Sequence, residues 1–257
     1  MIRANQALRL PLSIVAVLVI WQVVFMSGIV PGKYFPSVFA VLDGFWSMLL
    51  SGDLLKGEVP TFTRALVGLI GASVIGIALA IISDLNAVIG RGVRYLSDIL
   101  QPVPPAALVP MAVFMLGLGY KLYAFVIILV TVWPPYQNGL AALASVSAVQ
   151  LNTGRMLGYG KWDLLWRIKL PAALPEIFTG IRYAATISLI AVIVSEMLAG
   201  RDGIGFMIFK KAFASRSAEM FALMFVVGFN GIVLNAIVNL LRRWLTGWHI
   251  GMMERAS

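Results

Sequence analysis

The sequence predicts an all-α membrane protein with six spanning helices, and both its composition and its hydrophobic pattern point there. Of its 257 residues, 60% are hydrophobic and 12% are charged, and the mean hydropathy is +0.93. Soluble domains carry about 25% charged residues, so this chain has too little polar surface for a soluble globule. A spanning helix needs about 20 apolar residues, and six stretches of roughly this length follow one another. These observations exclude a soluble enzyme and a single-span anchor, and we expect residues 1–257 to form one membrane domain.

The six predicted spans differ in the residues that interrupt them. The first follows a short basic segment and has no small-residue cleavage site, so we expect it to be retained rather than removed as a signal peptide. In the second, small residues at every fourth position predict close packing on a neighbouring helix; they are Gly68, Ala72, Gly76 and Ala80. The spans cover about Leu12–Ile29, Ala65–Leu85, Leu96–Leu116, Tyr123–Leu143, Tyr183–Ala199 and Phe221–Leu241.

Prolines break the third and fourth spans. A proline has no backbone N–H and clashes with the preceding turn, and a carbonyl freed in this way inside a bilayer needs protein or cavity water as its partner. We therefore expect the third span to face protein or a pathway rather than lipid. The third span contains Pro102, Pro104, Pro105 and Pro110, and the fourth contains Trp133-Pro134-Pro135.

One face of the sixth span is polar. It consists of Gly228, Gly231, Asn235 and Asn239, which recur at steps of three, four and four and so share one side of a helix. Such a face is too polar for lipid, so we expect it to point into the bundle.

Glu196 is the one carboxylate that lies well inside a predicted span. An ionisable group there is costly to bury and marks a candidate gate or substrate path. It also lies within about a turn of the outer end, where it could reach water or pair with Arg201. Uncharged polar residues are further candidates for lining a translocation path, with hydrogen bonding between helices as the alternative. They are Gln101, Thr131, Gln137, Asn230 and Asn235.

The charge pattern predicts an orientation. The net charge of +9 and the pI near 10.1 could indicate nucleic-acid binding, but in a membrane chain they are more typical of basic cytoplasmic loops. With both termini in the cytoplasm, twelve of the twenty lysines and arginines lie inside, in agreement with the positive-inside rule. We therefore predict a multi-pass bacterial inner-membrane protein that is surrounded by lipid, has both termini inside and binds no nucleic acid.

The residue inventory also limits the chemistry. The chain has no cysteine and a single histidine, His249, so we expect no disulfide, no thiolate site and no metal cluster. It lacks the Gly-x-x-x-x-Gly-Lys-Ser/Thr loop that binds nucleotide phosphates. We therefore expect the chain to bind no cofactor and to draw its energy from a partner or from an ion gradient.

The longest segment outside the predicted spans covers about residues 145–180, between the fourth and fifth spans. Its apolar residues predict short helices with one apolar side. Such helices across the base of a bundle suit docking to a partner or contact with lipid headgroups, and the residues alone leave both open. The apolar residues are Val149, Met156, Leu157, Trp162, Leu164, Leu165, Trp166 and Ile168.

This segment also carries a spaced motif. Asn152-Thr153-Gly154, three residues, Gly158, nine residues and Ile168-Lys169-Leu170-Pro171 follow in order. The spacing resembles the EAA loop of the permease subunits of ATP-binding cassette importers, which reads Glu-Ala-Ala, three residues, Gly, nine residues, Ile-x-Leu-Pro. Gly and Ile-x-Leu-Pro fit without a gap. Asn-Thr-Gly replaces Glu-Ala-Ala and so removes a charge that could pair with a basic group on the ATPase.

Two further segments resemble the nitrate, sulfonate and taurine group of these permeases. One lies in the third span and the other follows the fifth, and the resemblance as a whole covers about residues 63–248. The segments are Gln101-Pro102-Val103-Pro104-Pro105 with Val109-Pro110 and Gly117-Leu118-Gly119, and Ser195-Glu196-Met197-Leu198 with Gly203-Ile204-Gly205.

The resemblance implies a type I importer architecture with separate subunits for separate tasks. Two permease copies, usually identical in this group, work with two ATPase subunits that carry ATP and Mg²⁺, and with one extracytoplasmic binding protein that delivers a small, commonly anionic solute. Residues 145–180 would form the coupling helices in a groove of the ATPase, where Gly158 permits a sharp turn and close approach. Leu170-Pro171 would end this element before the fifth span.

Residues 203–213 resemble the short outer helix on which the binding protein docks, with an interfacial anchor as the alternative.

The alternative function is a secondary transporter driven by an ion gradient. Such a transporter needs midplane carboxylates and usually an internal repeat, and the sequence offers only Glu196 and no repeat. A membrane-embedded enzyme would need a paired Ser and His, a metal cluster or two intramembrane aspartates, and the sequence offers none of these. We therefore predict a non-catalytic permease subunit that alternates between two states under control of a partner's nucleotide.

Overall fold

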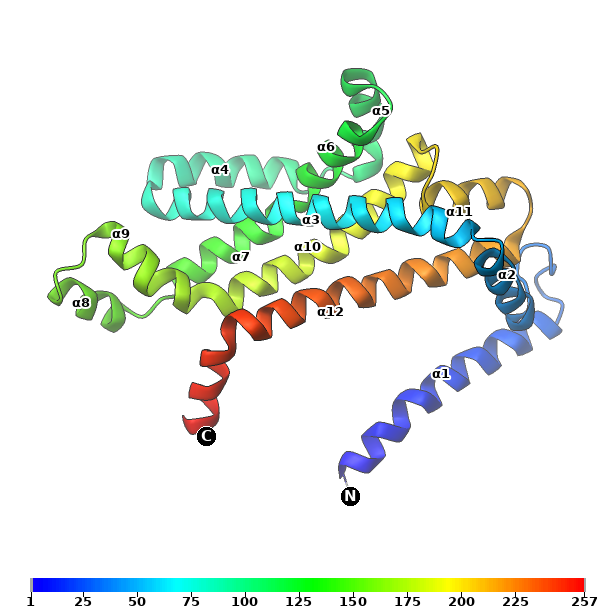
Figure 1. Cartoon of the computed structure of the whole chain (residues 1–257), viewed down its shortest axis with the longest axis horizontal. Coiled ribbons are helices and arrows are strands. Elements are labelled where there is room, and N and C mark those ends of the chain that lie inside the picture. The colour runs from blue at the N-terminus through cyan, green and yellow to red at the C-terminus, as the bar shows by residue number, and fades with distance from the viewer. Residues whose placement is uncertain (1, 257) are drawn as a thin grey trace.

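The computed structural model describes residues 2–256, with side chains for residues 12–247, and the described backbone is all-helical (Figure 1). The predicted all-α fold class is therefore confirmed. In chain order the elements are α1 (Ile2–Met26), α2 (Val38–Leu50), α3 (Asp53–Leu85), α4 (Ala87–Leu100), α5 (Pro105–Leu116), α6 (Tyr120–Thr131), α7 (Trp133–Ala144), α8 (Ala148–Met156), α9 (Lys161–Leu164), the π-helix η1 (Leu165–Lys169), α10 (Leu170–Ala199), α11 (Ile204–Phe213) and α12 (Ser217–Ala256).

Four helical stretches in the described chain are long and apolar enough to cross a membrane, and they contain the predicted second, fourth, fifth and sixth spans. They are Asp53–Leu85, Tyr120–Ala144, Lys161–Ala199 and Ser217–Gly247. The predicted first span lies on α1, whose described apolar part, Leu12–Met26, is shorter than a span needs. That α1 crosses the membrane therefore stays a prediction.

The predicted third span consists of two helices. α4 and α5 meet at a bend of 102°, and Pro104 lies between them in an extended conformation. The expected break at the prolines is confirmed, because proline disfavours helical geometry in the residue before it. α4 lies beside the end of α3, to which it is joined at Asn86 (Figure 1), while α5 packs against α6 and α10 through its buried residues Leu108, Val109 and Ala112. That the two halves cross as one broken span stays a prediction.

Two helices, α3 and α10, pack closely around the break between α6 and α7. Pro134 and Pro135 have no backbone N–H, so carbonyls one turn earlier lose their helical partners. Gly76 of α3 faces this break, since a Cβ there would lie 2.6 Å from the carbonyl oxygen of Val132. Gly180 of α10 faces it as well, with a Cβ 2.7 Å from the carbonyl oxygen of Pro134. α3 and α10 can approach the broken backbone only because both positions lack a side chain.

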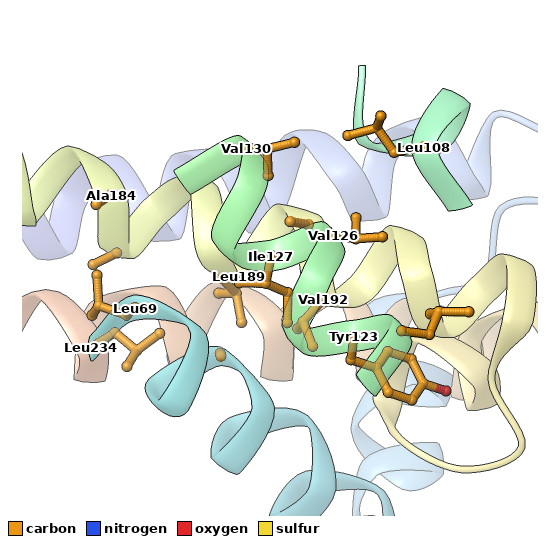
Figure 2. Packing of buried hydrophobic residues seen from close by; sticks show 14 of the residues in the cluster. Leu69, Leu108, Tyr123, Val126, Ile127, Val130, Ala184, Leu189, Val192 and Leu234 are labelled. Carbon is orange, nitrogen blue, oxygen red and sulfur yellow. The ribbon is translucent and has the colours of Figure 1, made fainter. Parts of the chain in front are cut away.

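The small-residue face predicted for the second span is confirmed as a packing surface. All four of its residues are buried on α3, and a Cβ on Gly68 would clash with Ile127 of α6. Beside this face, Leu69, Ile127, Leu189 and Leu234 join α3, α6, α10 and α12 in one buried cluster (Figure 2). The core of the bundle is therefore built around α3 and α10.

The buried side of α12 differs from the predicted one. Gly228 is exposed, and a Cβ there would meet nothing within 4 Å, so its predicted place in an inward face is wrong. The buried stripe instead contains Leu223, Val226, Asn230, Leu234 and Val238. Larger side chains make van der Waals contacts that glycine cannot offer, and inside a bilayer such contacts hold helices together.

Gly76→Ala should lower the melting temperature of the purified protein, because the added methyl group cannot avoid the carbonyl oxygen of Val132. Overpacking of this kind costs about 1–3 kcal/mol. Gly92→Ala is the control, since nothing lies within 4 Å of a Cβ at Gly92 on α4, and it should be neutral or slightly stabilising. Thermal unfolding in detergent measures both, and a Gly76→Ala protein as stable as the wild type would contradict the packing described here.

Candidate functional site

The loop that carries the sequence motif lies at one end of the molecule. α8, α9 and η1 are found where α7 ends and α10 begins (Figure 1). The hydroxyl of Ser147 accepts a hydrogen bond from the amide of Val149 and caps the start of α8. The predicted short helices are therefore present in this loop.

Gly158 ends α8 in a left-handed conformation, with φ at +80°. Its amide donates to the carbonyl of Arg155 at 3.0 Å, and the next amide, of Tyr159, donates to the carbonyl of Gly154 at 3.0 Å. A Cβ on Gly158 would meet nothing within 4 Å. The backbone turn, and not crowding within this chain, is therefore what favours glycine here.

Two parts of the motif pack against each other. Gly154 is buried on α8, and a Cβ there would lie 2.5 Å from Cδ1 of Ile168 and 2.7 Å from Cδ2 of Leu164. The motif spacing thus folds α8 onto the α9–η1 segment. Asn152 and Thr153 are exposed, and their side-chain hydrogen bonds stay within α8, which leaves them on the outside of the loop.

An ion pair and an apolar anchor fix the loop to the spanning helices. Nζ of Lys169 lies 2.8 and 2.7 Å from the two carboxylate oxygens of Asp84 at the end of α3. Leu165 is 1% exposed, and Leu170 packs into the same buried cluster, which includes Trp133. Sequence reasoning missed the pairing because 85 residues separate its members.

The Leu170–Pro171 step does not end a helix, so that expectation is wrong. The path from Lys161 to Ala199 is helical throughout, and η1 provides a π-helical turn just before Pro171. Pro171 lies in the first turn of α10, where a missing N–H is well tolerated. The loop therefore continues into the spanning helix as one rod.

Large apolar side chains point outward from the loop. Met156 is 89% exposed and Trp162 is 63% exposed. We call the exposed set the loop face; it consists of Val149, Met156, Leu157, Trp162 and Trp166. The remaining apolar residues of the predicted set are buried or half-buried, so the loop has one side attached to the bundle and one side without a described partner.

Glu196 is fully buried and ion-paired near the other end of α10. One carboxylate oxygen lies 2.7 Å from Nη1 of Arg64 on α3. The other accepts from the hydroxyl of Thr61 at 2.8 Å and from the amide of Gly205 at 3.0 Å. Glu196 therefore neither reaches water nor pairs with Arg201, the two alternatives to a gate. Arg64 lies 132 residues away in sequence, which is why sequence reasoning did not find it.

Arg64 connects this carboxylate to two further elements. Its Nη2 donates to Asp202 at 2.6 Å, and its guanidinium lies over the ring of Tyr123, 4.1 Å from the ring centroid. Two carboxylates and an aromatic face compensate a cation inside the bundle. We call Thr61, Arg64, Tyr123, Glu196 and Asp202 the Arg64 network; it joins α3, α6, α10 and the segment before α11.

The turn before α11 is shaped around Glu196. Gly203 has φ at +95°, and a Cβ there would clash with the Glu196 carboxylate. The amide of Ile204, at the start of α11, donates to the hydroxyl of Thr61 at 2.8 Å. The position of α11 therefore depends on the Arg64 network.

The uncharged candidates for a translocation path do not meet at one place in the described chain. Nε2 of Gln137 donates to Oε1 of Gln101 at 2.6 Å, which links α7 to the bend between α4 and α5. Nδ2 of Asn230 donates to Glu58 of α3 at 2.9 Å. These residues make the interhelical hydrogen bonds that were the alternative to lining a path.

Thr131 and Asn235 lack such interhelical partners. Oγ1 of Thr131 is buried with no hydrogen-bond partner among the described residues. Nδ2 of Asn235 donates to the carbonyl of Gly231 in its own helix at 2.9 Å, and its Oδ1 is buried without a donor in the described part of the chain. Of the predicted polar set, these two oxygens are free to accept a further hydrogen bond.

Known proteins resemble this chain over most of its length. The nitrate import permease protein NrtB of Synechocystis sp. is 30% identical over 246 residues, which cover 92% of this chain and 88% of that protein. The bicarbonate transport system permease protein CmpB of Synechococcus elongatus is 31% identical over 248 residues, with the same coverage. The taurine transport system permease protein TauC of Escherichia coli K12 is 25% identical over 242 residues, again with 92% and 88% covered.

A solved structure shares the fold. A chain of the inward-facing MetNI methionine ABC transporter superposes with a TM-score of 0.68 at 15% identity, covering 77% of this chain and 98% of that one. The sequence profile of the binding-protein-dependent transport system inner membrane component matches residues 72–248. This chain therefore belongs to that family, whose members are the permease subunits of ATP-binding cassette importers.

Proposed function

We propose that two copies of this chain form the membrane channel of an importer, together with two ATPase subunits and one extracytoplasmic binding protein. Each copy crosses the membrane six times, with both termini and the loop face in the cytoplasm and α11 outside. Family membership supports the two kinds of partner. ATP and Mg²⁺ belong to the ATPase subunits, and this chain converts their closure into movement of its helices.

The observation that carries this proposal is the loop face together with its attachment to the bundle. Five exposed apolar side chains form a docking surface for a protein partner. Behind them, Leu165 and the Lys169–Asp84 ion pair fix the loop to α10 and α3. A displacement of the loop by the ATPase would therefore move two spanning helices with it.

The solute is proposed to be a small anion. The named relatives import nitrate, bicarbonate and taurine by their descriptions, and each of these carries a negatively charged oxygen group. The net charge of +9 favours attraction of anions over cations. In this proposal Thr131 and Asn235 lie along the path, while Gln101, Gln137 and Asn230 shape it by holding helices together.

The Arg64 network is proposed as an outer gate that holds α11 against α3 and α10. α11 would be the docking helix for the binding protein, since basic residues outnumber the two acidic ones, Asp53 and Asp202, in the lining of a cavity of about 500 Å³ beside it. The basic residues of that cavity are Lys56, Arg201, Lys210, Lys211 and Arg216. Contact of the binding protein with α11 would therefore act directly on the gate formed by the Arg64 network.

Met156→Asp should remove the ATPase from the complex. A carboxylate buried without a partner in an apolar contact costs several kcal/mol, so recovery of the ATPase with the tagged chain should fall at least about tenfold. Phe213→Asp is the matched control, because Phe213 is 77% exposed on α11 at the other end of the molecule. Pull-down from native membranes with quantitative mass spectrometry measures both. Unchanged ATPase recovery with Met156→Asp would contradict docking on the loop face and favour contact with lipid headgroups.

Uptake should depend on ATP and not on an ion gradient. Cells depleted of ATP should lose uptake of labelled nitrate, bicarbonate or taurine, while cells treated with an ionophore that leaves ATP intact should retain it. A gradient-driven transporter would show the reverse pattern and would need a carboxylate free to bind the coupling ion. Glu196 does not fit that need, because Arg64 already neutralises it.

Glu196→Gln and Arg64→Gln should each destabilise the protein, and their effects should not add. Removing one member of a buried ion pair costs about 3–5 kcal/mol, because the other charge is left uncompensated. The double variant should be more stable than the sum of the two losses predicts, by about 0.5–3 kcal/mol. Thermal unfolding in detergent measures the cycle. Asp53→Asn, which removes the exposed pair with Lys56, is the control and should change little. Additive losses would show that Glu196 and Arg64 do not act as a pair.

A further inference from the structure

A second polar cavity lies between α10 and α12, away from the Arg64 network. It measures about 380 Å³, within the size range of small-ligand sites. Its polar lining comes from one face of each helix. The residues on these faces are Thr179, Arg182 and Thr186 on α10, and Asn235, Asn239 and Arg242 on α12, and Phe178 and Tyr183 of α10 complete the lining. On each helix they recur at steps of three or four, so they share a side.

The charges of this cavity are all positive. No acidic residue lines it, and neither Arg182 nor Arg242 has an ion pair or side-chain hydrogen bond in the described part of the chain. By contrast, Arg64, Arg167 and Arg216 each have a carboxylate partner. Arg182 and Arg242 are both exposed, and an anion between them would reduce their mutual repulsion.

The remaining lining groups suit the oxygens of such an anion. The side-chain amide of Asn239 and the hydroxyl of Thr186 make no hydrogen bond within the described residues, so both can donate. Guanidinium groups form forked, charge-assisted hydrogen bonds to phosphate, sulfonate and carboxylate groups. The buried Oδ1 of Asn235 has no donor within the described chain and would accept from a hydroxyl, an ammonium or a water of the ligand.

The two arginines lie on the same side of the spans expected from the sequence. Arg182 directly precedes the predicted fifth span, and Arg242 directly follows the sixth. In the structure the cavity lies near the middle of α10, since Arg182 follows two residues after Gly180, which packs on the break between α6 and α7. Basic pockets between spanning helices on the cytoplasmic side are suited to anionic headgroups.

We propose that the α10–α12 cavity is a binding site for one oxyanion group, held by Arg182 and Arg242 and oriented by Asn239. The same chemistry is offered by the phosphate of an anionic phospholipid and by a free anion that leaves the inner end of the path. The assignment of this site to the cytoplasmic side rests on the proposed function. Anion binding at the site does not depend on the proposed function.

The test uses the full chain, purified in detergent with its copurifying subunits and stripped of lipid. One arm adds phosphatidylglycerol, with phosphatidylcholine as the uncharged reference. The other adds sodium sulfate, with sodium chloride at equal ionic strength as the reference. Melting temperature is followed against concentration, and native mass spectrometry counts the lipid molecules retained.

The wild-type protein should be stabilised in at least one arm, and the variant Arg182→Gln/Arg242→Gln should lose apparent affinity by at least about tenfold for each arginine. Asn239→Ala keeps both charges and should lose about two- to tenfold. Arg243→Gln is the matched control, because it removes the same charge from an exposed neighbour that does not line the cavity.

The pattern of responses identifies the source of the anion. A response to phosphatidylglycerol alone assigns the site to lipid, and a response to sulfate alone assigns it to a free solute. If neither arm distinguishes the double variant from Arg243→Gln, the site does not exist. Each result is read on purified protein, so it stands apart from the pull-down and uptake experiments. Loss of the proposed ATPase contact would leave it unchanged.

Discussion

Close contact between helix backbones at the proline break of α6 and α7 is the constraint on which the rest of the bundle depends. Within a bilayer no water reaches a freed carbonyl, so a helix broken at Pro134 and Pro135 has to be enclosed by protein. Gly76 and Gly180 allow α3 and α10 to come close enough to do so. α3 and α10 therefore pack against the same helix, α7, and this packing fixes the positions of their ends. The loop face and the Arg64 network are built on those ends.

α3 and α10 are tied to each other at both ends as well as in the middle. Near the loop face, Lys169 of η1, directly before α10, pairs with Asp84 of α3, and near α11, Glu196 of α10 pairs with Arg64 of α3. A slip of one helix along the other by a single turn, about 5.4 Å, would break both pairs at once. Because charges left unpaired inside a protein are costly, α3 and α10 have to move as one body.

Features that depend on residues close together in the sequence could be predicted, whereas ion pairs between residues far apart in the sequence were missed. The small-residue face of α3 and both proline breaks follow from spacing and from the chemistry of single residues, and both were found. Gly158 was expected at a turn, and its left-handed backbone agrees. The partners of Glu196 and Lys169 lie 132 and 85 residues away, and no local pattern marks them. Pro171 was expected to end a helix; the preceding π-helical turn, which has no sequence signature, keeps the helix continuous.

The rigidity of α3 and α10 limits how the two proposed docking sites can communicate. A relay of side chains through the core would need residues with two packing arrangements, but glycine contacts against backbone leave no room for a second one. Rotation of the tied unit needs no such rearrangement. Pressure on the loop face would then displace α11, because the two lie at opposite ends of one body that includes α7. In the proposed importer, the ATPase and the binding protein are therefore coupled by the tilt of this unit.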